Sequence, residues 1–282
     1  MLGKSQAPSR KDAEAKGWLE ALGAQALGAY QLVVGLLSIL SAALRSSIAP
    51  GKGAAEVCRA LTIRQIFYTS FQTLSMVSVV ALLIGATLVA QTELLGGTIH
   101  RDIAARIVVA IILREVAPLV TAIIVTGRSG TAIATELGVM KVNQEVIGLA
   151  SLGIDPPRFL VWPRILATTL SVPLLTVFFS AAAVLGGLAV AFLMDSEGVG
   201  EWQVGVSMGL TPWDLPLLLV KSIGLGAIIG WVCSYYGLEV GVPPTEVPQK
   251  ASKAIVRTLV ALIAFNATMT VAFYWIVGTR LS

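Results

Sequence analysis

Five apolar stretches, each long enough to cross a lipid bilayer, constrain this chain more than any other feature of its sequence. A membrane-spanning helix needs about 20 mostly apolar residues. The runs reach or exceed that length at about 67–91, 103–126, 160–194, 214–237 and 256–278. Charged residues make up only 13% of the chain, about half the share in a soluble domain. The sequence therefore predicts an all-α integral membrane protein and excludes a soluble enzyme.

Another apolar segment, 18–44, precedes these spans, and the charges around it indicate how it lies. Lys and Arg collect on the cytoplasmic side of short loops. If 18–44 lies in the membrane interface, 15 Lys and Arg fall on one side and three on the other, whereas a crossing helix gives 11 against seven. We therefore expect an interfacial elbow helix, a cytoplasmic N-terminus and a C-terminus outside. The basic loops account for the positive net charge, so nucleic acid is not an expected partner.

This topology divides the chain into three parts. Residues 1–17 form a polar cytoplasmic N-terminus, 18–64 hold the interfacial helix and a basic connector, and 65–282 form a five-helix membrane domain. Within the spans, prolines remove backbone donors and predict kinks. Small residues four apart allow helices to approach closely, and we favour internal packing over a dimer seam. The prolines are Pro118, Pro173 and Pro216. The small residues at four-residue spacing are Ala183, Gly187 and Ala191 in one span and Gly226 and Gly230 in another.

Ionisable residues inside the spans are the first candidates for a functional site. A charge at the centre of a bilayer costs about 3 kcal/mol on insertion scales. The position of Arg114, Glu115 and Lys221 inside the spans therefore requires a functional or structural explanation. They could line a cavity that receives a polar headgroup, or Glu115 and Lys221 could form a buried pair that fixes helix register. Asn266 and Thr268 in the last span are predicted to be interhelical hydrogen-bond donors.

The longest polar interruption, 126–163, lies between the second and third spans. Its first part predicts a short helix over 129–140 that begins at Ser129 and ends near Gly138, and its second part a helix over 143–153. Two short helices joined by a turn would form a rigid cytoplasmic lever. The other inner loop, 237–252, is rich in proline and is expected to be a connector.

Several kinds of chemistry lack the residues that they need. Binding and hydrolysis of ATP by this chain would require GxxxxGK followed by Ser or Thr, and that motif is absent. The only histidine, His100, excludes HExxH zinc sites. The outer loop offers only scattered acids, expected to form a solvated or docking surface. These acids are Asp195, Glu197, Glu201 and Asp214.

Four motifs between residues 113 and 167 occur in a characteristic order. They are GR-x-G at 127–130, ELG-x-M at 136–140, GIDP at 153–156 and PR at 163–164. In order and spacing they resemble the MlaE/YrbE family of ABC-transporter permeases. The resemblance implies an elbow helix plus five transmembrane helices, a homodimer, and movement of phospholipid or a similar hydrophobic molecule between an inner and an outer membrane.

The same resemblance implies partners and roles. The partners are a second copy of the chain, a dimeric cytoplasmic ATPase that carries ATP and Mg, a periplasmic MCE-domain protein and, in some systems, a STAS-domain protein. A coupling helix after the second span would meet the ATPase, and the chain itself would hold no cofactor. The residues given this coupling role are Gly127, Arg128, Gly130, Glu136, Gly138, Met140 and Glu145. Family members commonly carry an aspartate where this chain has Ile147.

A mechanism follows as a hypothesis, with two alternatives. Two copies would enclose a lipid-sized cavity lined by Arg114, Glu115 and Lys221, and closure of the ATPase would rock the helices between two packings. An ion-gradient-driven secondary transporter would use Glu115 as its proton carrier, but the chain shows no inverted repeats. A membrane-embedded lipid-modifying enzyme would need a nucleophile beside a base, which the outer loop lacks.

Overall fold

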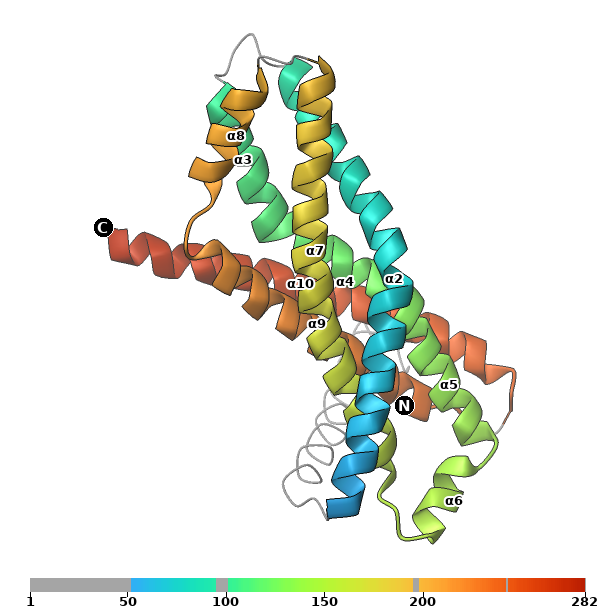
Figure 1. The fold of residues 1–282 in the computed structure, drawn as a ribbon. Coiled ribbons are helices and arrows are strands. Elements are labelled where there is room, and N and C mark those ends of the chain that lie inside the picture. The colour runs from blue at the N-terminus through green and yellow to red at the C-terminus, as the bar shows by residue number, and fades with distance from the viewer. Residues whose placement is uncertain (1–51, 95–100, 195–197, 242, 282) are drawn as a thin grey trace, which may run out of the picture.

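The computed structural model describes residues 52–94, 101–194, 198–241 and 243–281, and the regular elements within these ranges are helices (Figure 1). The expected interfacial helix at 18–44, His100, Asp195 and Glu197 lie outside the described residues. The elements, with π-helical turns labelled η, are α2 (Lys52–Leu94), α3 (Arg101–Ile111), η1 (Ile112–Val116), α4 (Ala117–Val125), η2 (Thr126–Gly130), α5 (Thr131–Val142), α6 (Glu145–Ser151), η3 (Pro157–Val161), α7 (Trp162–Met194), α8 (Gly198–Gly209), α9 (Asp214–Leu238) and α10 (Glu246–Leu281).

Within the described residues, five helical runs are long and apolar enough to cross a membrane, as the sequence predicts. They are Arg59–Thr92, Ile103–Val142, Pro157–Met194, Asp214–Leu238 and Glu246–Trp275. Large apolar side chains such as Leu83, Leu185 and Val260 point outward along these runs and remain exposed. An exposed apolar exterior of this extent suits contact with lipid rather than water. The chain is an all-α integral membrane protein.

The second run corrects the expectation of a separate helix at 129–140. The helix continues from α4 through the π-helical turn η2 into α5 without a break. This helical run ends at Val142, and Gln144 just after it has a left-handed conformation (φ 59°). Ser129 does not begin a helix and Gly138 does not end one, because both lie inside this continuous run. At 1.5 Å per residue its length is about 60 Å, about twice the thickness of the hydrocarbon layer.

Two short helices lie outside the five runs, at opposite ends of the molecule (Figure 1). α6 confirms a helix within the predicted segment 143–153, and Gly153 follows it with a φ of 74°. α8 was not predicted, since the sequence suggested only an outer loop there. Four of the twelve residues of α8 are glycine, which disfavours helix formation. α8 forms nevertheless because it packs along α3 and buries Trp202 in the core.

Small residues let the long helices meet backbone to backbone. α2 and α7 run side by side (Figure 1), and a Cβ atom added to Gly186 would lie 2.4 Å from the carbonyl oxygen of Leu82. A Cβ atom on Gly226 of α9 would lie 2.5 Å from the carbonyl oxygen of Thr168 on α7. These contacts confirm internal packing as the role of the small-residue repeats. α2 begins at Lys52, so part of the connector expected before residue 65 is helical.

We predict that Gly186→Ala destabilises the chain, because the new methyl group must displace the backbone of α2. Overpacking of this kind costs about 1–3 kcal/mol, which lowers the midpoint of thermal unfolding measured in detergent. Gly148→Ala is the matched control, since a Cβ atom there meets nothing within 4 Å and alanine favours helix. Equal unfolding midpoints for the two variants would contradict the packing described above.

Candidate functional site

Two ion pairs join the π-helical turn η1 to α9 within the apolar bundle. Arg114 Nε lies 2.7 Å from Asp214 Oδ1, and Lys221 Nζ lies 2.9 Å from Glu115 Oε1. Asp214 and Lys221 are seven residues apart and therefore share one face of α9. Arg114 and Glu115 are adjacent, so their side chains diverge and reach different turns of that face. Glu115 and Lys221 form the ion pair that is one of the two arrangements open from sequence.

The backbone near Pro118 explains why Lys221 points at this place. Proline has no N–H, so Pro118 cannot donate to the carbonyl of Arg114 four residues earlier. Lys221 Nζ donates to that carbonyl at 2.8 Å. In a bilayer an unpaired carbonyl is costly, and the lysine removes this cost while it also pairs with Glu115. The proline and the charged side chains therefore form one unit.

α10 completes the network from the other side. Asn266 Nδ2 donates to Glu115 Oε2 at 3.0 Å, and the hydroxyl of Thr270 lies 2.8 Å from Glu115 Oε1 and 2.7 Å from Lys221 Nζ. The predicted interhelical role of Asn266 is confirmed. The prediction for Thr268 is wrong, because its hydroxyl donates to the carbonyl of Ala264 within α10. Thr270, one turn beyond Asn266 on the same helix face, is the residue that sequence reasoning missed.

The four charged groups differ in exposure. The side chain of Lys221 is 0% exposed and that of Asp214 is 3% exposed, whereas Glu115 keeps 35% of its side chain accessible and Arg114 is partly open. Lys221 Nζ has three hydrogen-bond partners, as many as an ammonium group has N–H bonds. Lys221 is therefore fully satisfied inside the protein, and Arg114 and Glu115 present the accessible edge of the network.

Asp214 is the main correction to the predicted set of site residues. The sequence placed it among the solvated acids of an outer loop, but it is buried and pairs with Arg114. Its second oxygen accepts a hydrogen bond from the backbone N–H of Thr211 at 2.7 Å. Its position directly before an apolar run is typical of an acid in the first turn of a helix. Its spacing of seven residues from Lys221 could have identified it.

The residues with the implied coupling role are divided between the interior and the surface. Gly130 and Gly138 are buried, and Cβ atoms added there would lie 2.9 Å from Cys233 Sγ on α9 and 3.1 Å from a methyl group of Val247 on α10. Gly127 and Arg128 are exposed on η2, and the Arg128 guanidinium donates to the carbonyl of Gln72. Gly130, at the end of η2, and Gly138, within α5, therefore let this part of the helical run pack closely against α9 and α10.

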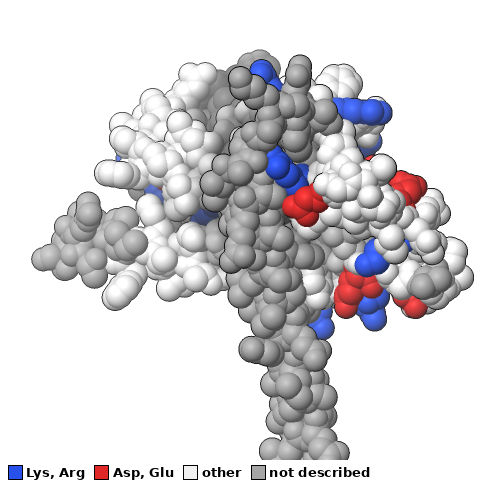
Figure 2. Space-filling model, turned by 90° about the horizontal axis from the view of Figure 1, so that it is seen from below, with Lys and Arg blue, Asp and Glu red and all other residues white. Residues whose placement is uncertain are grey.

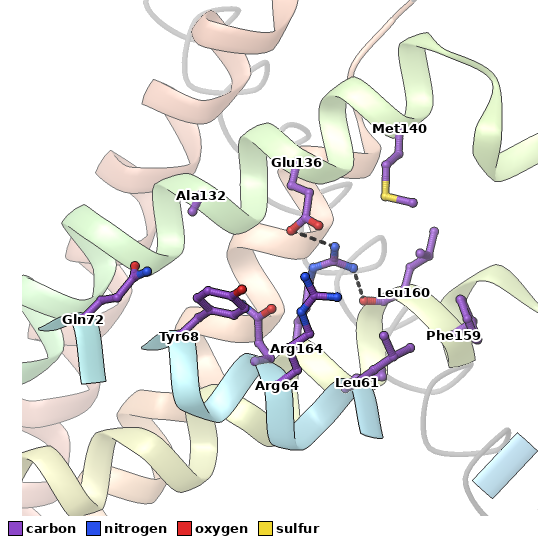
Figure 3. Close-up of a pocket in the computed structure, with 12 residues that line it drawn as sticks. Leu61, Arg64, Tyr68, Gln72, Ala132, Glu136, Met140, Phe159, Leu160 and Arg164 are labelled. Atoms are coloured by element: carbon purple, nitrogen blue, oxygen red, sulfur yellow. Dashed lines mark hydrogen bonds and ion pairs between the residues drawn. The ribbon is translucent and has the colours of Figure 1, made fainter. Parts of the chain in front are cut away.

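The remaining coupling candidates lie toward the α6 end. Glu136 and Met140 line a cavity of about 430 Å³ between α2, α5 and the start of α7 (Figure 3). Glu136 Oε2 lies 3.0 Å from a terminal nitrogen of Arg164. Glu145, the first residue of α6, is exposed and accepts a hydrogen bond from the side chain of Asn143 at 3.3 Å.

α6 presents apolar side chains outside the spans. Ile147 is 63% exposed and Leu152, just after the helix, is 76% exposed, whereas Val146 and Leu149 pack against the core. Figure 2 views the molecule from this end, where basic and acidic side chains gather over one part of the face. Exposed apolar residues among charged ones are typical of a docking surface for another protein.

We predict that Lys221→Met destabilises the chain by about 3 kcal/mol, because removing one partner of a buried pair leaves the other charge uncompensated. The double variant Glu115→Gln/Lys221→Met should regain part of the loss, since it removes both charges. Lys253→Met, at an exposed lysine of α10, is the control. Thermal unfolding in detergent measures all of these effects, and additive losses in the double variant would contradict the coupling.

Comparison with known proteins places this arrangement in a family. The model of the family described as Permease MlaE matches residues 62–272, which include both ion pairs and α6. A "probable ABC transporter permease protein" of Rickettsia prowazekii is 29% identical over 244 residues, covering 86% of this chain and 92% of the relative. The "intermembrane phospholipid transport system permease protein MlaE" of Haemophilus influenzae is 25% identical over 222 residues (76% and 83%), and "protein TRIGALACTOSYLDIACYLGLYCEROL 1, chloroplastic" of Arabidopsis thaliana is 30% identical over 177 residues (60% and 48%). The chain belongs to the MlaE permease family.

Proposed function

We propose that the chain is the membrane-spanning subunit of an ABC transporter that moves phospholipid between two membranes. The observation that carries the proposal is the family match over residues 62–272, which spans the five apolar helices. The relative from Haemophilus influenzae is named as a phospholipid transport permease. In this proposal the chain is a transporter subunit of a bacterial inner membrane and works as a homodimer, with its N-terminus cytoplasmic and its C-terminus periplasmic.

The partners follow the same proposal. A separate cytoplasmic ATPase dimer would bind ATP and Mg, and this chain would hold neither. A periplasmic MCE-domain protein would meet the opposite end of the bundle, where α3 and α8 pack together (Figure 1). A STAS-domain protein would act on the ATPase rather than on this chain.

α6 is proposed as the contact with the ATPase. It lies outside the apolar runs, and it carries the exposed side chains of Glu145 and Ile147. Movement of α6 would pass into α5, which continues into η2 and α4 without a break. Gly130 and Gly138 seat α5 against α9 and α10, so α5 would transmit a displacement as a rigid body. Arg128, Glu136 and Met140 would move with α5 and η2 as parts of this rigid body. Gly127 would lie at the point about which the rigid body turns.

The accessible edge of the ion network is proposed to meet the lipid. Two copies would enclose a cavity into which Arg114 and Glu115 each present part of a side chain. Arg114 would donate to a headgroup phosphate while it remains paired with Asp214. Lys221 would hold Glu115 in place rather than touch lipid, because its side chain is wholly buried.

An ion-driven transporter is not favoured by the geometry around Glu115. A proton-carrying carboxylate must lose and regain its charge, but both oxygens of Glu115 accept hydrogen bonds and one of them pairs with Lys221. Release of Glu115 from these contacts would also leave the buried Lys221 without its carboxylate partner. A membrane-embedded enzyme is not favoured either, since the chain belongs to a permease family.

We predict that Ile147→Glu weakens ATP-dependent phospholipid transfer, because a charge at the centre of the α6 surface would have to be buried against the ATPase. A central interface residue contributes about 2 kcal/mol or more, so both ATPase co-purification and transfer between vesicles should fall at least about tenfold. Val204→Glu on α8 is the matched control for ATPase co-purification, at an exposed valine of the opposite end. Normal co-purification and transfer in Ile147→Glu would refute α6 as the contact.

A further inference from the structure

We infer that the cavity at the α6 end binds the headgroup of an anionic phospholipid whose acyl chains lie along the outer face of α2. The cavity has a volume of about 430 Å³ and is bounded by α2, α5, η3 and the start of α7 (Figure 3). It is separate from the ion network formed by Arg114, Glu115, Asp214 and Lys221. The inference concerns binding alone and holds whether or not this lipid is the one transported.

Arg164 supplies a buried donor that has no partner among the described residues. One terminal nitrogen donates to the carbonyl of Leu160 at 2.6 Å, and the other pairs with Glu136 at 3.0 Å. The Nε atom is buried and makes no hydrogen bond within the part of the chain that the structure describes. A buried donor left unsatisfied costs free energy, so the site favours a ligand that brings an acceptor oxygen to Arg164.

Arg64 supplies the second positive charge. Its guanidinium lies 5.6 Å from the ring centroid of Tyr68, and among the described residues no carboxylate forms an ion pair with it. Figure 3 shows Arg64 on α2 and Arg164 on α7 with their guanidinium groups in the same part of the cavity. Two such groups repel one another, and a phosphate between them would accept hydrogen bonds from both.

The charge balance of the lining favours an anion. Among the twelve residues drawn in Figure 3, the charged side chains are those of Arg64, Arg164 and Glu136. The cavity therefore carries one more positive charge than negative charges. Glu136 is 57% exposed, so it can turn toward solvent when a phosphate takes its place beside Arg164. Bound phosphate and the Glu136 carboxylate would thus compete for one guanidinium group.

The surface beside the cavity indicates a lipid rather than free phosphate. Phe67 and Phe71 flank the lining residue Tyr68 on α2, both exposed, with their rings stacked at 5.3 Å between centroids. Leu82, also exposed, lies further along α2 on the side that carries these two rings. Acyl chains would cover these apolar side chains while the headgroup enters the cavity, whereas an inorganic ion would leave them unused.

The test is a binding titration of the purified full chain in detergent, followed by native mass spectrometry. The probes are dioleoylphosphatidylglycerol, dioleoylglycerol, which lacks the phosphate, and inorganic phosphate. Loss of one charge-assisted contact should make Arg64→Gln bind phosphatidylglycerol about tenfold more weakly. Glu136→Gln should bind it more tightly, because the competing carboxylate is gone. Arg59→Gln, at an exposed arginine of the same helix outside the cavity, should match the wild type.

Four results would overturn the inference. Equal weakening in Arg64→Gln and Arg59→Gln would mean that phosphatidylglycerol responds only to overall charge. Unchanged binding of phosphatidylglycerol by Arg64→Gln would exclude the cavity as the headgroup-binding site. Equal binding of dioleoylglycerol would show that the headgroup phosphate contributes nothing. Displacement of the lipid by millimolar inorganic phosphate would show that the acyl chains contribute nothing. Because no ATPase is present in this titration, its outcome is independent of whether ATP-driven transport by the chain is confirmed.

Discussion

The bilayer offers no water to a charged side chain, so each ionised group inside it must find its partners within the protein. Lys221 meets this requirement with bonds to Glu115, to Thr270 and to the carbonyl that Pro118 leaves unpaired. This cluster ties η1, α9 and α10 together at one point in the bundle. The ion pair of Arg114 with Asp214 reinforces the join between η1 and α9, and small and apolar side chains make up much of the remaining contact.

A continuous helix links that cluster to the surface outside the apolar layer. The run Ile103–Val142 carries Arg114 and Glu115 in its first third and ends where the chain turns into α6. It is far longer than a bilayer requires, and the glycines of α5 hold its end against α9 and α10. A displacement at α6 therefore has a rigid path to the charged cluster. The cavity that holds Arg164 and Glu136 borders the same path, so an occupant could influence it.

Much of the fold was predictable from sequence, because apolar length and small-residue spacing report directly on lipid contact and helix approach. The five spans, the internal packing at Ala183 and Gly226, and the role of Asn266 belong to this class. Features set by long-range contact were not predictable from local pattern. Asp214 resembles a loop acid until α9 is placed against η1, and α8 is too rich in glycine to form without α3 beside it.

The energy source for phospholipid transfer is the measurement that tests the account most directly. The chain would be placed in vesicles with its ATPase, and transfer of a labelled phospholipid would be followed with ATP withheld and, separately, with the proton gradient collapsed by an ionophore. The account predicts that transfer requires ATP and continues without a gradient, because the proposed ATPase supplies the energy and Glu115 serves as a fixed partner of Lys221 and Asn266. Transfer that proceeds without ATP and stops when the gradient collapses would contradict it and make Glu115 the proton carrier.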